Sequence, residues 1–249
     1  MGQTLDSTAL PAKFGRMEKV IVTLRTGTAD DEWARRLRGP IADQLLALGL
    51  PGLTVNVRDA DVRDALMTLT TLDPPVQAFV TLWTQQYYGE QVRAALDVLA
   101  GHADLVAAYL VTESAPMPPP VTPSGERTAA LANIALLRRP ADMAEPTWLD
   151  RWHGSHTQVA IDTQSTFGYI QNYVVRALTP DAPVVDAIVE ELFPDAAVTS
   201  LHAFFGAADD DDLRDRMEQM VASTAAFGAN VNIDAVPTSR YLFRSPFRD

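Results

Sequence analysis

The chain has 249 residues, of which 47% are hydrophobic, so it can bury a full core as one large domain or two small ones. Its formal net charge of −12 disfavours nucleic acids and anionic membrane surfaces as partners, because both require basic patches. The absence of cysteine excludes disulfides, zinc fingers, iron–sulfur clusters and thiol nucleophiles. With no apolar leader-like run and no stretch of about 18 apolar residues, we expect a cytoplasmic location.

The first half alternates short β-rich runs with amphipathic stretches. Residues 31–48 place Trp33 and Leu37 on one stripe of a helix. The expected elements are strands at 19–25, 53–58, 76–84 and 105–112, helices at 31–48 and 88–100, and a short helix at 61–69. The main elements follow the order β-α-β-β-α-β of the ferredoxin-like unit. We therefore expect one ferredoxin-like half over 18–114, after a flexible arm over 1–17.

A proline-rich segment separates this half from the next. Five prolines between Ala115 and Gly125 indicate a stiff, extended linker, which we assign to residues 115–128. The second half, 129–249, then repeats the order. Its expected elements are strands at 131–138, 167–176, 198–206 and 230–236 with 241–243, and helices at 146–163, 184–193 and from the acidic cap 209–212 to 227.

Several residues recur at an almost constant spacing, which implies an internal duplication. The pairs are Trp33 with Trp148 and Gly39 with Gly154, 115 apart, and Gly52 with Gly168 and Asn56 with Asn172, 116 apart. A glycine inside a helix costs about 1 kcal/mol relative to alanine, so the helical pair indicates a shared close contact. Two sheets covered by helices on one face each are expected to pack through their other faces, as an intramolecular pseudo-dimeric α+β barrel.

The second-half helix carries Trp148, Trp152 and His156 on one face, because their spacing is i, i+4, i+8. It follows a strand that ends at 137–140 and precedes an aromatic strand at 168–173. This arrangement resembles the EthD domain of the dimeric α+β barrel superfamily. The resemblance covers the second half well and the first half only in outline. It implies an apolar cavity between helices and sheet, with the helix histidine facing it.

His156 is the residue that matches the family's histidine, and it is our candidate catalytic residue. An unperturbed imidazole titrates near 6.5 and can act as a general acid or base. The alternative is a structural histidine that bonds a strand carbonyl. In the first half, Ile41 occupies the position equivalent to His156, and Leu37 occupies the position equivalent to Trp152. We therefore expect one site per chain, in the second half.

Other candidate ligand-binding residues surround this helix. Trp152 and Trp148 could stack on an aromatic ligand or belong to the core. The strand side chains Tyr169, Gln171 and Tyr173 share one face, which points either to the helix-side cavity or to the barrel interior. His202 is expected mid-strand, either in the same cavity or at the contact between the sheets. A third ligand beside His153 and His156 is missing, so we expect no metal, and no cofactor is expected either.

The sequence thus predicts an EthD-like protein that binds a small apolar or aromatic molecule. The most specific version of this predicted function is a cofactor-free enzyme of the oxidoreductase, cyclase or decarboxylase type that uses His156 as acid or base. The alternative is a non-catalytic binding or accessory protein of a catabolic or biosynthetic pathway, and haem binding is a further alternative. The expected partners are the small ligand, no nucleic acid and no membrane, with a pseudo-dimer inside one chain and a homodimer left open.

Overall fold

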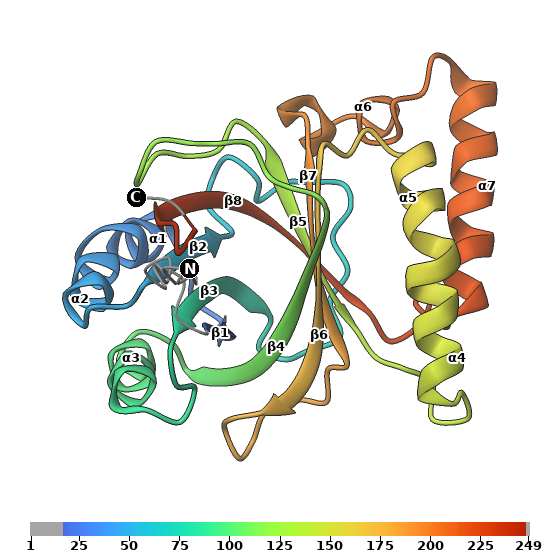
Figure 1. The fold of residues 1–249 in the computed structure, drawn as a ribbon. Coiled ribbons are helices and arrows are strands. Elements are labelled where there is room, and N and C mark those ends of the chain that lie inside the picture. Colours follow the sequence, from blue (N-terminus) through green and yellow to red (C-terminus); the bar gives the residue numbers. More distant parts are fainter. Residues whose placement is uncertain (1–16, 248–249) are drawn as a thin grey trace, which may run out of the picture.

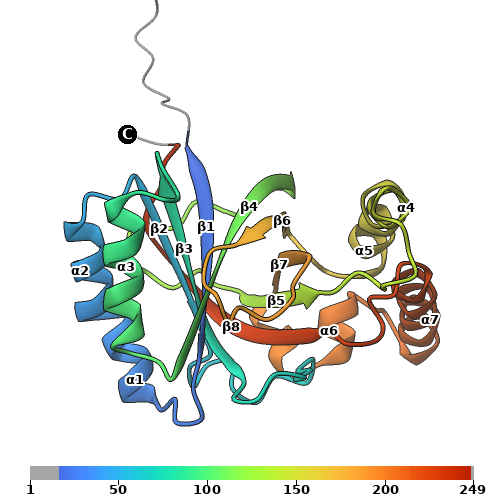
Figure 2. The same ribbon diagram turned by 90° about the horizontal axis from the view of Figure 1, so that it is seen from below.

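The protein forms one closed antiparallel barrel of eight strands. The computed structural model describes residues 17–247, so the expected arm lies outside the described residues except for Met17. The strand order around the barrel is β1-β3-β2-β8-β5-β7-β6-β4. Helices from the first half lie on one side of the barrel and helices from the second half lie on the other (Figures 1 and 2). The expected α+β barrel is therefore present.

The first half has the predicted main elements. They are β1 (Glu18–Arg25), α1 (Asp31–Arg36), a π-helical segment η1 (Leu37–Ile41), α2 (Ala42–Ala47), β2 (Gly52–Val57), β3 (Val76–Thr84), α3 (Glu90–Ala100) and β4 (Leu105–Met117). The prediction of a short helix at 61–69 is wrong. This segment is a run of turns whose backbone bonds to the second half of the chain. Leu66 N donates to Val198 O, and Leu69 forms a bridge with Ala235. Strand β4 also extends into the predicted linker.

The second half has the same main order with two differences from prediction. Its elements are β5 (Leu131–Leu137), α4 (Glu145–Leu149), a π-helical segment η2 (Asp150–His156), α5 (Thr157–Thr163), β6 (Gly168–Ala177), β7 (Ala187–Phe193), a 3-10 turn η3 (Asp195–Val198), α6 (Leu201–Phe205), α7 (Asp210–Ala226) and β8 (Asp234–Arg244). The predicted helix at 184–193 is strand β7, whose two faces are both buried. The predicted strand at 198–206 is also wrong, because this segment contains helix α6. Ser200 caps the start of α6, and Gly206 ends it in the left-handed backbone conformation.

The two halves meet along their sheet edges. The first half has the strand order β4-β1-β3-β2, and the second has the corresponding order β8-β5-β7-β6. Pairing of β4 with β6 and of β2 with β8 closes the barrel. Closure leaves neither four-stranded sheet with an unpaired edge, which removes the usual sites of unwanted strand addition.

The recurring glycines occupy two different kinds of position. Gly39 and Gly154 lie in the π-helical segments, and a Cβ at Gly39 would have no atom within 4 Å, so the predicted close contact is wrong there. Pro40 follows Gly39 and disturbs the helical bonding at that point. Gly52 and Gly168 do make close contacts, because a Cβ at either would lie 2.8 Å from a side chain of the paired strand.

The barrel interior changes character along its axis. One end is an apolar core formed by inward side chains from six strands. The core contains Ile21, Val76, Phe79, Ala107, Tyr109, Val111, Ile134, Leu136, Val185, Ile188 and Val236. The other end carries buried polar and charged side chains from the same inward faces, among them Lys19, Asn56, Asn172 and Arg240. A closed barrel of this size is normally filled by side chains, so the charged end stands out as the unusual part.

Candidate functional site

The predicted aromatic residues pack between the second-half helices and the sheet. We call this region the helix-side layer, with Trp148, Trp152, Tyr169 and Phe227 as its main members. None of these four side chains is more than 1% exposed. The Trp148 ring centroid lies 5.1 Å from that of Trp152 and 6.4 Å from that of Phe227. The two tryptophans and Tyr169 thus lie together in a closely packed layer, and Tyr169 takes the helix-side alternative of the two that the sequence left open.

His156 faces helix α7 within the same layer. Its Nδ1 lies 2.9 Å from Ser223 Oγ, and its ring centroid lies 4.7 Å from that of Phe227. Burial lowers the pKa of His156 to about 4, so the imidazole is neutral at pH 7. The residue is 8% exposed, so the helix-side layer leaves it little contact with solvent.

Of the remaining predicted residues, Gln171 and Tyr173 also face the second-half helices, and His202 lies elsewhere. Gln171 Nε2 donates to Thr157 Oγ1 at 2.8 Å, which ties strand β6 to helix α5. Tyr173 OH donates to Glu145 Oε1 at 2.7 Å, and this bond raises the pKa of the phenol to about 12. His202 lies on helix α6 and not on a strand, with Nε2 3.0 Å from Asp210 Oδ1. It therefore joins neither the helix-side layer nor the sheet contact that the sequence analysis considered.

The helix-side layer also contains polar groups that the sequence analysis missed. Asn133, Glu191 and Tyr169 lie opposite one another on the neighbouring strands β5, β7 and β6. Within the described range, Asn133 Oδ1 and the indole N–H of Trp152 are buried without a hydrogen-bond partner. Burial raises the pKa of Glu191 to about 8. The available signal was a carboxylate within an apolar run, which is unusual for a strand buried on both faces.

A separate pocket of about 270 Å³ opens at the charged end of the barrel. We call it the barrel pocket. Inward side chains form its floor and the segments before β5 and after β8 form its rim. The lining residues are Lys19, Thr54, Thr81, Trp83, Glu113, Ala115, Pro118, Pro119, Pro120, Val121, Ile170, Glu190, Arg240, Leu242, Ser245, Pro246 and Phe247. The sequence pattern does not indicate this site, because the proline segment that forms part of its rim is typical of a linker.

One wall of the barrel pocket carries a buried lysine. Lys19 Nζ donates to Glu113 and, at 2.7 Å, to Asn172 Oδ1. Burial lowers the pKa of Lys19, and the adjacent Glu113 carboxylate partly offsets this effect. The Lys19 ammonium also lies 5.2 Å from the centre of the Trp83 ring, within cation–π range.

The opposite wall carries a buried arginine. Arg240 is 4% exposed, and its Nε lies 3.1 Å from Glu190 Oε1. Asn56 Nδ2 donates to the same Glu190 oxygen at 2.8 Å. Arg240 Nη1 and Thr54 Oγ1 are buried without a hydrogen-bond partner among residues 17–247. The pocket therefore combines two carboxylate–cation pairs with polar atoms that have no partner within the described part of the chain.

Residues 17–247 contain neither a cluster of metal ligands nor a membrane-spanning helix. No group of three or more His, Asp or Glu side chains in this range is arranged to hold a metal ion. No helix in this range combines the length and the apolar character needed to cross a membrane.

Comparison with solved structures identifies the fold class. No family model matches the sequence, and neither does any curated protein. The structure is similar to that of an anthrone oxidase-like protein, with a TM-score of 0.55 and 10% identity over 94% of this chain and 97% of that one. A provisionally assigned monooxygenase from Lactobacillus acidophilus gives a TM-score of 0.46 at 8% identity, covering 91% and 95%. Chlorite dismutase from Candidatus Nitrospira defluvii gives 0.45 at 9% identity, covering 90% of each chain.

At such low identity the first similarity defines a fold and no activity. This chain and the anthrone oxidase-like protein share one fold. The EthD family itself is not among the matches, so the assignment to that family stays a prediction.

Proposed function

We propose that this cytoplasmic protein binds a small, largely apolar or aromatic molecule in the barrel pocket. The observation that carries this proposal is an open space of about 270 Å³ beside buried polar atoms without partners. A buried donor or acceptor left unsatisfied costs about 1–3 kcal/mol, so such atoms normally meet a ligand or ordered water. Trp83, Leu242 and Pro246 supply the apolar surface that such a ligand needs.

We also propose that the barrel is an intramolecular pseudo-dimer. The two halves share one strand order, and Gly52 and Gly168 contact large side chains of the paired strand in the same way. The two asparagines predicted as counterparts act reciprocally across the barrel. Asn56 of the first half bonds Glu190 of the second, and Asn172 of the second half bonds Lys19 of the first. Fusion in one chain would make this association independent of protein concentration.

A second candidate function is acid–base catalysis in the helix-side layer, as the EthD resemblance implies. Its specific support is a carboxyl with a pKa of about 8, Glu191, in the layer that contains His156 and the unpartnered Trp152 N–H. Groups whose pKa values are moved strongly in opposite directions are typical of acid–base sites. In this candidate the closely packed layer opens, Trp152 and Tyr169 hold the substrate, and His156 moves the proton without a cofactor. The similarity to an anthrone oxidase-like protein agrees with an oxidoreductase of this kind.

The binding proposal is tested with a panel of single-ring aromatic compounds. Saturation-transfer NMR compares the wild-type protein with Leu242→Trp, which fills the pocket, and with Leu105→Trp, whose side chain is already 45% exposed outside it. We expect ligands to bind the wild type and Leu105→Trp but not Leu242→Trp, with unchanged circular dichroism in all three. Absence of binding to the wild type, or equal binding to Leu242→Trp, contradicts the proposal.

The catalytic candidate is tested with anthrone and dioxygen, whose reaction gives anthraquinone and water. His156→Asn is compared with His153→Asn, which changes an exposed histidine on the same helix. Positioned acid–base groups contribute about 10²–10⁴-fold, so His156→Asn should lower turnover at least about 100-fold while His153→Asn retains it. Without wild-type turnover of this substrate, or with equal turnover in the two variants, the non-catalytic alternative is preferred.

A further inference from the structure

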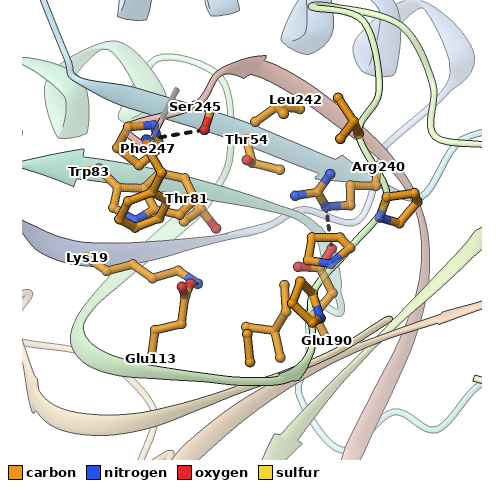
Figure 3. A pocket seen from close by; sticks show the side chains of 17 residues that line it. Lys19, Thr54, Thr81, Trp83, Glu113, Glu190, Arg240, Leu242, Ser245 and Phe247 are labelled. Atoms are coloured by element: carbon orange, nitrogen blue, oxygen red, sulfur yellow. Dashed lines mark hydrogen bonds and ion pairs between the residues drawn. The ribbon is translucent and has the colours of Figure 1, made fainter. Parts of the chain in front are cut away.

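Three side chains form a diagonal row across neighbouring strands on the floor of the barrel pocket. In the strand register, Arg240 on β8 lies opposite Asn56 on β2. Thr54 precedes Asn56 by two residues on β2 and lies opposite Thr81 on β3. Trp83 lies two residues beyond Thr81, on the same inward face. Arg240, Thr54 and Trp83 are thus diagonal neighbours within reach of one ligand. Figure 3 shows their side chains around the same open space.

We propose that the pocket's ligand is a neutral, single-ring aromatic carbonyl compound, whose oxygen accepts hydrogen bonds from Arg240 and Thr54. This inference rests on the proposed binding function and specifies the chemistry of its ligand. Arg240 Nη1 can only donate, and Thr54 Oγ1 is free to donate. A carbonyl oxygen has two lone pairs and no proton, so it can accept from both atoms at once.

The charge of the pocket selects a neutral ligand. Lys19 and Arg240 supply two positive charges, and Glu113 and Glu190 supply two negative charges. These formal charges cancel within two ion pairs. A carboxylate or an ammonium ligand would add a charge without a counterion, and an uncompensated buried ion costs several kcal/mol. A neutral acceptor satisfies the two free groups without this cost.

The rest of the lining selects an aromatic body of limited size. The Trp83 indole is 8% exposed and forms one wall, and Pro246 closes against it beside Gly52. Phe247 packs edge-on against Trp83 at 6.4 Å and is itself 56% exposed, so it lies at the entrance (Figure 3). A volume of about 270 Å³ equals roughly nine waters at about 30 Å³ each, which suits one ring with a short substituent.

The test uses four ligands of similar shape and different polarity. These are acetophenone, benzoate, benzylammonium and ethylbenzene, with dissociation constants measured by ligand-detected NMR. We expect acetophenone to bind at least 10-fold more tightly than each of the others. If benzoate or benzylammonium binds most tightly, or if ethylbenzene equals acetophenone, the carbonyl assignment is overturned while the binding function stands. If no compound of the set binds, the proposed binding function itself has failed.

Two variants locate the acceptor contact. Thr54→Val keeps the shape of the side chain and removes its hydroxyl, so it should weaken acetophenone about 5- to 10-fold and leave ethylbenzene unchanged. The double variant Arg240→Met with Glu190→Gln keeps the charge balance and should abolish the preference for acetophenone. Carbonyl-labelled acetophenone provides a direct readout, because bonding to Arg240 lowers the frequency of its infrared C=O stretch. An unshifted stretch in the bound wild type contradicts the contact.

Discussion

Glu191 makes the stability of the protein depend on pH in a direction opposite to most native carboxylates. Burial raises its pKa from 4.5 to about 8, so the folded state binds a proton that the unfolded state releases. Stability associated with this group is complete below about pH 4.5 and is lost as the pH rises through about 8. Glu191→Gln removes the titrating proton and should therefore be more stable than the wild type at alkaline pH.

The magnitude follows from the size of the shift. A rise from 4.5 to about 8 corresponds to about 5 kcal/mol at 1.36 kcal/mol per unit, which is an upper limit. Glu191 keeps some contact with solvent, which screens part of this effect. We therefore expect the stability difference between Glu191→Gln and wild type to grow by about 2 kcal/mol between pH 5 and pH 8.5.

Urea unfolding at several pH values measures this difference directly. His156 works in the opposite direction, because its pKa of about 4 removes stability as the pH falls below 6.5, but it is present in both proteins and cancels. Glu218→Gln is the matched control, since Glu218 is exposed on α7. A constant difference between Glu191→Gln and wild type across the pH range would refute the assignment of a buried, neutral carboxyl.

Three further predictions concern packing and polar contacts. Gly52→Ala should cost about 1–3 kcal/mol and change the fluorescence of Trp83, because the new Cβ would lie 2.8 Å from the indole. Trp33→Phe should cost about 1 kcal/mol more than Trp152→Phe in urea unfolding, since only the Trp33 indole donates a hydrogen bond, at 2.7 Å; equal costs would contradict this. Asp234→Ala should lower stability by about 3–5 kcal/mol, because the Arg138 side chain, which is only 10% exposed, loses its carboxylate partner; a thermal midpoint near that of wild type would argue against it.

Much of the fold was predictable because local patterns agree with it. The helix predicted over 146–163 spans the observed α4 to α5, and the acidic run at 209–212 caps α7 as expected. The wrong prediction of a helix at 184–193 falls where two faces are buried at once. In β7 apolar side chains point both to the barrel and to the helices, so the sequence shows neither a period of two nor a period of 3.6.

The barrel pocket could not be predicted for a different reason. In β1, Lys19, Thr23 and Arg25 alternate with apolar residues, a pattern typical of a strand with one face in water. That polar face instead lines the closed barrel, and Lys19 finds its partners in Glu113 and Asn172, 94 and 153 residues away. Only the closed tertiary structure shows that these charges are buried and paired.

The way the barrel closes has a consequence for how the chain is made. Strand β2 pairs with β8 between residues as distant as Asn56 and Arg240, more than 180 positions apart. During synthesis the outer edges of β2 and β4 stay unpaired until the second half has left the ribosome. Strand pairings between residues so far apart in the sequence form slowly, and unpaired strand edges can associate with other chains in the meantime. The nascent first half is therefore the stage at which this protein depends most on chaperones, and its expression should respond more to changes on β2 and β4 than to equivalent changes on β1.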